Sequence, residues 1–137
     1  MGRPAIKVTV DTNVLVRAAI VDHSEQSQLA AQALQDAHTV ALPLPVLCEF
    51  VWVLRRGYGR STEEITEALD QLLADPKVVY DEPVVEYAIA FLKRGGDFAD
   101  GVIAYLGSRL GAEEFVTFDR KAAQLVTQTG MSARLLD

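Results

Sequence analysis

Short runs of β-branched residues alternate along this chain with longer amphipathic stretches, and this alternation limits the folds open to it. The first run, Ile6 to Val10, places an apolar side chain at every second position, which predicts a strand. Strands separated by helical segments require crossovers, which are right-handed and give a mainly parallel sheet covered on both faces. We therefore expect an α/β fold of three layers (α/β/α) with a mainly parallel sheet of four to five strands.

Capping residues, prolines and glycines indicate where the elements begin and end. Ser24 can cap a helix that runs to about Ala37. The stretch from Ser61 to Glu64 is a capping box, with Ser and Glu three residues apart. The expected helices are 14–20, 24–37, 43–57, 61–76, 82–95, 97–110 and 122–127, and the expected strands are 6–10, 39–42, 77–80, 115–118 and 133–136.

The composition indicates a single globular domain that takes up the whole chain, residues 1–137. Its apolar runs are all shorter than the ~18 residues of a membrane span, and Met1 to Ala5 lacks the apolar region of a signal peptide. One cysteine and two histidines argue against an internal disulfide and against the usual zinc sites. We expect a soluble, cytoplasmic protein without a membrane partner.

The formal net charge is −6, with 19 acidic and 13 basic residues. This balance argues against binding nucleic acid through net charge alone. It does not exclude a protein whose acids are concentrated in a metal site, so the positions of the acids matter more than their number.

Several acids stand where an α/β fold places its ligands. Asp11 and Asp119 each follow an expected strand, and the carboxyl ends of parallel strands meet at one edge of the sheet. Asp97 and Asp100 are three residues apart at a helix start and share a face. Glu49 is isolated in an apolar segment, where burying a carboxylate is costly without a partner.

Each acid also has a purely structural interpretation. Asp11, Asp97 and Asp119 are good N-caps, Asp100 can complement a helix dipole, and Glu49 can lie on the solvent edge of its helix. Capping does not explain an isolated Glu, however. If the acids meet, each pair ~5 Å apart repels by roughly 3 kcal/mol, so the cluster requires a cation, and hard oxygen ligands favour Mg²⁺ or Mn²⁺.

Four pieces of the sequence together resemble a PIN-domain ribonuclease, and within that group a VapC-type toxin of a toxin–antitoxin pair. The pieces are Val10-Asp11-Thr12-Asn13, Glu49, the run from Asp97 to Ala104, and Thr117-Phe118-Asp119-Arg120-Lys121. Their order and spacing match over essentially the whole chain. One departure is Gly101, where alanine is more usual; by its low propensity it should slightly weaken the helix start.

The resemblance implies an endoribonuclease that cleaves RNA with Mg²⁺ or Mn²⁺, and it assigns the catalytic and metal-binding roles to Asp11, Glu49, Asp100 and Asp119. Asp97 either contributes to a second metal or only caps its helix. Thr12 and Thr117 are expected to orient a carboxylate or a water. Asn13 is expected to hold the strand-to-helix turn through its amide.

The resemblance also implies an RNA substrate, a homodimer and a cognate antitoxin that inhibits the enzyme. Arg55, Arg56 and Arg60 are the first candidates for a path that contacts RNA; the other candidates are Arg17, Lys93, Arg94, Arg120 and Lys121. A basic pair before Gly57 is also what a helix C-terminus favours. The apolar helices Val46 to Leu54 and Ile65 to Leu73 are candidates for the antitoxin surface.

The same residues bear on three other functions. An aspartyl phosphatase would place a second Asp two residues after Asp11, where this chain has Asn13. A receiver-type phosphoacceptor domain would need paired acids at the first strand and a later lysine. A catalytically inactive PIN scaffold is the alternative without enzymatic activity, and the presence of all four acids ranks it below the nuclease.

Overall fold

The computed structural model describes residues 4–22 and 24–137, and these residues divide into two compact units, Met1–Tyr80 and Asp81–Asp137. The expectation that no signal peptide is present depends partly on residues 1–3, which lie outside the described part. None of the helices in the described ranges has the length and apolar character that crossing a bilayer demands.

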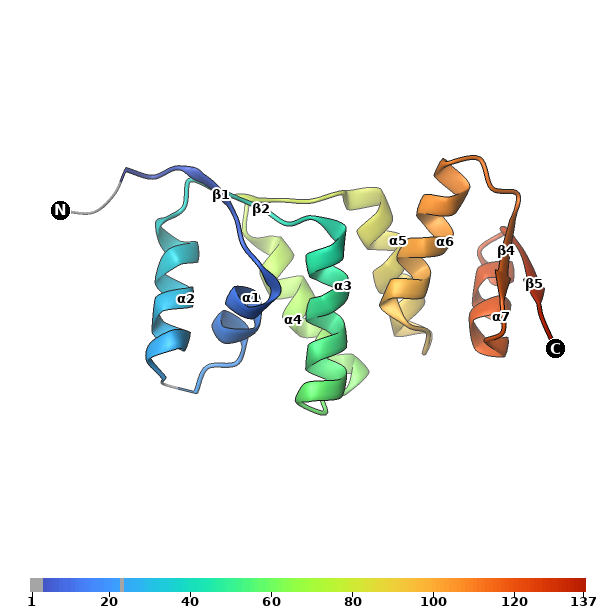
Figure 1. The fold of residues 1–137 in the computed structure, drawn as a ribbon, viewed down its shortest axis with the longest axis horizontal. Coiled ribbons are helices and arrows are strands. Elements are labelled where there is room, and N and C mark those ends of the chain that lie inside the picture. The colour runs from blue at the N-terminus through green and yellow to red at the C-terminus, as the bar shows by residue number, and fades with distance from the viewer. Residues whose placement is uncertain (1–3, 23) are drawn as a thin grey trace. The chain divides into compact units, whose positions relative to one another are not determined.

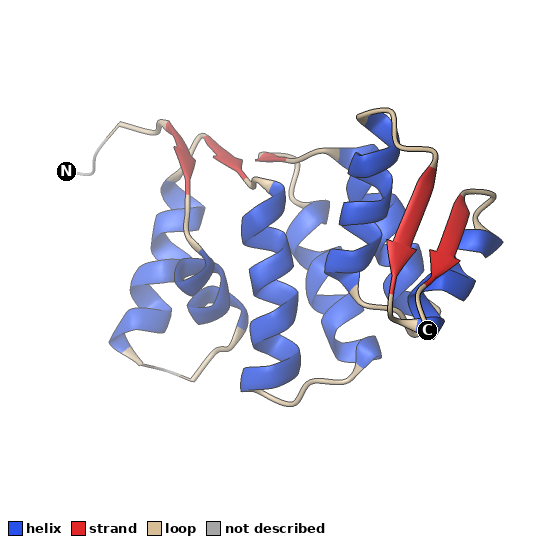
Figure 2. Ribbon diagram, turned by 45° about the vertical axis from the view of Figure 1, so that its right-hand side comes forward, coloured by secondary structure: helices blue, strands red, loops and turns tan. Residues whose placement is uncertain are grey.

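Unit 1 contains three short parallel strands with helices between them (Figures 1 and 2). The strands pair in the order β1-β2-β3, with Val8 opposite Val40 and Val40 opposite Val78. The elements of unit 1 are β1 (Lys7–Thr9), α1 (Thr12–Ala19), α2 (Glu25–Asp36), β2 (Thr39–Ala41), α3 (Leu44–Trp52), the π-helical turn η1 (Val53–Gly57), α4 (Thr62–Ala74) and β3 (Val78–Val79).

Unit 2 contains three helices and a pair of parallel strands. Strand β4 pairs with β5, with Phe115 opposite Ala133. The elements of unit 2 are α5 (Glu82–Lys93), α6 (Phe98–Arg109), β4 (Glu114–Thr117), α7 (Arg120–Gln128) and β5 (Ser132–Leu135).

The expected α/β class and the parallel direction of the strands are confirmed. The strands differ from the expectation in their pairing, because the described strands form one three-stranded and one two-stranded sheet instead of a single sheet. The strands are two to four residues long, so each ladder holds few hydrogen bonds, and a sequence pattern does not specify which strand edges pair.

The local signals at the helix starts are confirmed in detail. The Ser24 hydroxyl accepts a hydrogen bond from the Ser27 N–H at 3.1 Å. Ser61 and Glu64 form a complete capping box, with the Glu64 N–H donating to Ser61 Oγ and the Ser61 N–H donating to Glu64 Oε1. These bonds satisfy N–H groups that the first helical turn would otherwise leave without partners.

The core of unit 1 is built from the inward faces of its helices and from strand β2. Phe50 on α3 and Leu69 on α4 are fully buried, as is Val40. The apolar side chains of α3, η1 and α4 that were candidates for an antitoxin surface are therefore largely core residues, including Leu47, Phe50, Leu54, Ile65 and Leu69. Trp52 is an exception on α3, with 63% of its surface exposed.

Unit 2 packs α6 closely onto α5 at Gly101. A Cβ added to Gly101 would lie 3.0 Å from Ala88 Cα and 3.1 Å from Phe91 Cβ. The absence of a side chain allows this close approach of the two helices. The glycine that weakens the helix start by propensity thus contributes a packing contact that alanine would crowd.

Candidate functional site

Asp11 lies just beyond the end of β1 and caps α1. The Val14 N–H donates to Asp11 Oδ1 at 3.1 Å, and the backbone of Asp11 is extended, with φ −86° and ψ 175°. The capping interpretation is therefore confirmed for this residue. Its other carboxylate oxygen, Oδ2, accepts no hydrogen bond from any residue that the structure describes, so capping leaves half of the carboxylate available to a ligand.

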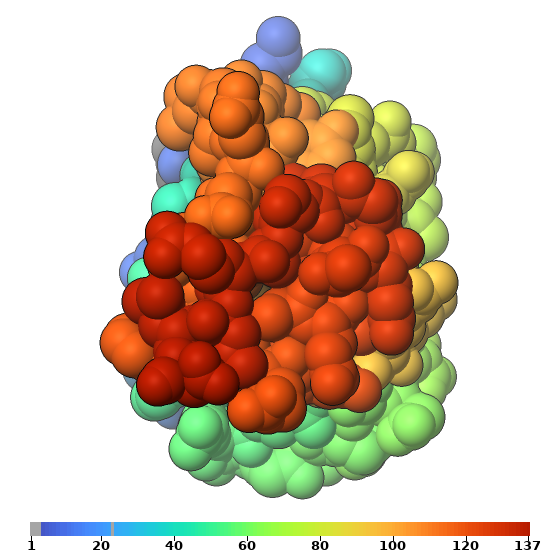
Figure 3. Space-filling model, turned by 90° about the vertical axis from the view of Figure 1, so that its right-hand side faces the viewer, coloured from blue at the N-terminus to red at the C-terminus, as the bar shows by residue number. Residues whose placement is uncertain are grey.

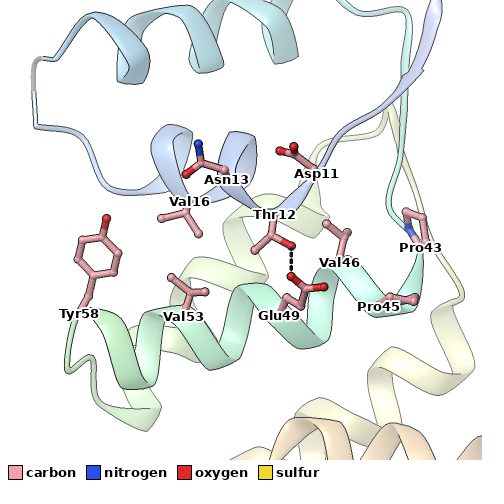
Figure 4. A pocket seen from close by; sticks show the side chains of 10 residues that line it. All are labelled: Asp11, Thr12, Asn13, Val16, Pro43, Pro45, Val46, Glu49, Val53 and Tyr58. Carbon is pink, nitrogen blue, oxygen red and sulfur yellow. Dashed lines mark hydrogen bonds between the residues drawn. The ribbon is translucent and has the colours of Figure 1, made fainter.

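Glu49 lies on the exposed side of α3, opposite the start of α1 (Figure 4). Its helix buries Val46, Leu47 and Phe50 on other faces, so the solvent-edge interpretation of Glu49 describes its position and no burial cost arises. The Thr12 hydroxyl donates to Glu49 Oε2 at 3.1 Å. Thr12 therefore orients a carboxylate, which is one of the two roles expected for it.

Asp11 and Glu49 line one cleft of about 670 Å³ within unit 1. Figure 4 shows Pro43 and Pro45 at one end of this cleft, Tyr58 at the other, and the two acids between them. Most of the remaining lining is apolar, so the acids face an open space bounded by hydrophobic side chains.

Asn13 does not hold the strand-to-helix turn as the sequence suggested. Its side-chain amide forms no hydrogen bond with a described residue, and the side chain is exposed beside the cleft. The turn is held instead by the cap from Asp11. The amide of Asn13 is consequently available to a ligand.

In unit 2, Asp97 and Asp119 are both helix caps. The Ala99 N–H donates to Asp97 Oδ1 at 3.2 Å, and the Ala122 N–H donates to Asp119 Oδ1 at 3.1 Å. The Asp119 N–H in turn donates to the Thr117 hydroxyl at 2.9 Å, so Thr117 positions Asp119 through its backbone. The remaining oxygen of each Asp, Oδ2, accepts no hydrogen bond from the described parts of the chain.

Asp100 stands in the first turn of α6, half-buried between these two caps. Burial raises the pKa of the Asp100 carboxyl above its usual range, and the negative charges of Asp97 and Asp119 raise it further. Both causes disfavour the ionised form. Unit 2 therefore contains a carboxylate whose charge lacks compensation from a nearby cation.

The Gly95–Gly96 turn holds the start of α6 against the unit 2 core. A Cβ at Gly96 would lie within 2.4–2.6 Å of Phe91 and Leu125 side-chain atoms, and Gly95 has a positive φ of 93°. Both positions therefore depend on glycine. The turn fixes the position of Asp97, the next residue, relative to α5 and α7.

The donor chemistry of these acids suits a hard divalent cation. Asp11, Glu49, Asp97, Asp100 and Asp119 form no ion pair with a described lysine, arginine or histidine, whereas Asp22, Glu64, Asp81 and Glu114 do pair with arginines. Carboxylate oxygens without basic partners are ligands of Mg²⁺ and Mn²⁺. In neither unit, over residues 4–22 and 24–137, do three or more metal-binding side chains converge closely enough to hold an ion.

Two of the three arginines first suggested for RNA contact have intramolecular partners. Arg55 donates to the Thr62 hydroxyl at 2.8 Å and to the Arg60 carbonyl, and Arg60 lies 3.7 Å from Glu64. These contacts close the loop between η1 and α4. Arg56 remains exposed and has no ion pair with a described acid.

Unit 2 offers a second set of cations near its acids. Arg109 pairs with Asp81 and Arg134 with Glu114. The basic residues of unit 2 that pair with no described acid are Lys93, Arg94, Arg120 and Lys121. Arg120 and Lys121 begin α7, which Figure 3 shows on the surface of unit 2 beside β5, and the Lys121 side chain lies over Gly95. Arg120 and Lys121 therefore lie beside the Asp119 cap of α7, whereas Arg94 donates to Gln128 in the last turn of that helix.

The sequence predicts Phe118 as the last residue of a strand and assigns it no other role. It follows β4 directly, between Thr117 and Asp119, and 81% of its surface is exposed. The strand alternates exposed and half-buried side chains from Glu114 onward. Extending that period of two by one residue would have placed Phe118 on the exposed face.

Known proteins resemble this chain in sequence. The family model described as PIN domain matches residues 8–126, a range that includes all five acids. A VapC ribonuclease from Aquifex aeolicus (strain VF5) is 29% identical over 97 residues, which cover 69% of this chain and 72% of that protein. With the match spanning most of its length, the chain belongs to the PIN domain family.

Proposed function

We propose that the protein is a Mg²⁺- or Mn²⁺-dependent endoribonuclease of the VapC type, acting in the cytoplasm as the toxin of a toxin–antitoxin pair. The observation that carries the proposal is the match of residues 8–126 to the PIN domain model. The caps Asp11, Asp97 and Asp119 support it, because each accepts a hydrogen bond from a helix N–H through one carboxylate oxygen and leaves the other without a partner among the described residues. Similarity to a protein named VapC ribonuclease supports RNA as the substrate.

We propose that residues 1–137 act as one PIN domain and that Asp11, Glu49, Asp100 and Asp119 hold the metal together. A divalent ion bound by these carboxylates supplies a Lewis acid for a phosphodiester and lowers the pKa of a water. The raised pKa of Asp100 supports this proposal, because a nearby cation would favour the ionised carboxylate that burial and Asp97 and Asp119 now disfavour.

The remaining residues have supporting roles in this proposal. Thr12 holds Glu49 in one orientation, and Thr117 fixes the backbone of Asp119. Arg120 and Lys121 would contact RNA phosphates, since they follow Asp119 directly and have no ion pair with a described acid. Lys93 and Arg94, at the end of α5, are further candidates. Arg56 is the remaining candidate from unit 1.

An antitoxin and a second copy of the chain are the proposed protein partners. An antitoxin that entered the cleft of Asp11 and Glu49 would block RNA from these acids. An inactive scaffold is less favoured, since Asp11, Glu49, Asp100 and Asp119 are all present in this chain.

A ribonuclease assay tests the proposed function. The purified protein is expected to cleave single-stranded RNA with Mg²⁺ or Mn²⁺ and to lose this activity in EDTA. Asp11→Asn and Asp119→Asn are each expected to reduce the rate about 100-fold or more, the scale of losing an electrostatic contact to the transition state. Asp70→Asn removes an exposed acid of α4 and is the matched control, with wild-type activity expected.

Two outcomes would contradict this function. Cleavage that persists in EDTA would exclude the metal mechanism. Wild-type protein that leaves RNA intact with either metal, while binding the metal, would favour the inactive scaffold.

A further inference from the structure

The cleft of unit 1 extends beyond the acids, toward Tyr58. Figure 4 shows Val16 and Val53 between the acids and Tyr58, with Asn13 on the same side. The volume of about 670 Å³ lies within the range of small-molecule sites, which combine apolar walls with a few polar groups. The end of the cleft near Tyr58 has apolar walls and polar groups, and it lies apart from the acids.

Tyr58 is held in place by the turn that ends α3. The Tyr58 N–H donates to the Val53 carbonyl at 3.2 Å, closing the π-helical turn η1. Gly59 then reverses the chain with a positive φ of 62°, and Arg55 bonds to both Arg60 and Thr62. The ring is thus presented at the end of the cleft by a cross-linked loop, with 41% of its surface exposed.

The polar groups at this end of the cleft are unused. Neither the Asn13 amide nor the Tyr58 hydroxyl forms a hydrogen bond with a residue in the described ranges. No lysine or arginine among the described residues lines the cleft, so nothing there would attract a phosphate. A flat, uncharged ligand with hydrogen-bonding edges fits these walls better than an anion does.

We propose that this end of the cleft binds a nucleobase of the RNA, next to the phosphodiester held at the acids. Tyr58 stacks on the base and the Asn13 amide reads its edge. An amide that donates and accepts side by side pairs best with adenine, so adenine is the base we assign. The proposal rests on the proposed ribonuclease function, because the base would be part of the same substrate.

Binding of fluorescent 2′-O-methyl oligonucleotides, measured by anisotropy, tests the subsite. The measurement is made in EDTA, where a metal-dependent ribonuclease binds the oligonucleotide but does not cleave it. Wild type is expected to bind oligoadenylate more tightly than oligouridylate. Asn13→Ala should remove this preference, and Tyr58→Leu should weaken binding to both about tenfold through loss of stacking. Tyr58→Phe keeps the ring and should bind both oligonucleotides as wild type does. Trp52→Leu removes an exposed aromatic at the end of α3 that does not line the cleft and should bind as wild type.

The outcomes separate the subsite from the catalytic function. Equal affinity for the two oligonucleotides, or Asn13→Ala and Tyr58→Leu proteins that bind as wild type, overturns the subsite, even if the wild type cleaves RNA with metal. The expected binding pattern in a protein that never cleaves RNA supports the subsite and contradicts the nuclease. Weakening by Trp52→Leu equal to that by Tyr58→Leu would place the contact outside the cleft and overturn the proposal.

Discussion

At the scale of single residues, Thr12 gives the sharpest link between geometry and chemistry. Its hydroxyl donates to Glu49 Oε2, and groups that orient a metal ligand typically contribute 10–100-fold to metal affinity or activity. We expect Thr12→Val to lower metal-dependent RNA cleavage by about 10–100-fold, with Thr12→Ser close to wild type. Equal activity of Thr12→Val and wild type would show that this hydrogen bond does not matter for the reaction.

The raised pKa of Asp100 predicts a change in stability that can be measured without an activity assay. Because its pKa is raised in the folded protein, ionised Asp100 destabilises the metal-free fold at neutral pH. Asp100→Asn should therefore melt at a higher temperature than wild type in EDTA at pH 7.

The pH dependence of this effect follows from the sign of the shift. Wild-type Asp100 becomes protonated as the pH falls through its raised pKa, and the penalty is gone below the unfolded value of 3.8. The difference in melting temperature between Asp100→Asn and wild type should shrink from pH 7 toward pH 4. If Asp100→Asn instead melts below wild type at pH 7, and this deficit disappears toward pH 4, the ionised carboxylate is stabilised in the fold. Other titrating groups, such as Asp22 and Asp81, are common to both proteins and cancel.

At the scale of elements, three helix starts carry both a cap and a proposed ligand. Serine caps a helix about as well as aspartate but is a poor substitute for a carboxylate at a metal. Asp119→Ser should therefore keep its melting temperature within about 2 °C of wild type, since cap exchanges of this kind cost tenths of a kcal/mol, and lose RNA cleavage.

Asp97→Ser is the matched comparison for Asp119→Ser. If Asp97 only caps α6, this variant should be as stable and as active as wild type. Loss of activity without loss of stability would add Asp97 to the metal site. Calorimetry and the RNA assay on the same two preparations decide between these results.

The elements themselves were mostly predictable from the sequence, because their signals are local. Ser24, the capping box at Ser61 and the caps at Asp97 and Asp119 all form the bonds that their residue types favour. The role of Gly101 was not predictable, because it depends on the distance to Ala88 on another helix. The exposure of Glu49 was likewise a question of which helix face packs inward, and the sequence left it open.

At the scale of the whole molecule, the sequence indicated the α/β class and the family but not the pairing of strands in two sheets. Strand pairing depends on contacts between distant segments, which short apolar runs such as Val78–Val79 do not encode individually. The candidate acids were predictable by position and type. Which cations remain free for RNA was not, because Arg55 and Arg60 have partners that only the folded loop between η1 and α4 provides.

The central proposal is that Asp11, Glu49, Asp100 and Asp119 bind one metal ion. Calorimetric titration with Mn²⁺ of wild type, Asp11→Asn and Asp100→Asn tests this most directly, with Asp70→Asn as control. We predict that Asp11→Asn and Asp100→Asn each lower the Mn²⁺ affinity about tenfold or more, since losing even a group that orients a ligand costs this much. The Asp70→Asn control should bind Mn²⁺ with the affinity of wild type. Unchanged Mn²⁺ affinity in either site variant would contradict a shared metal site.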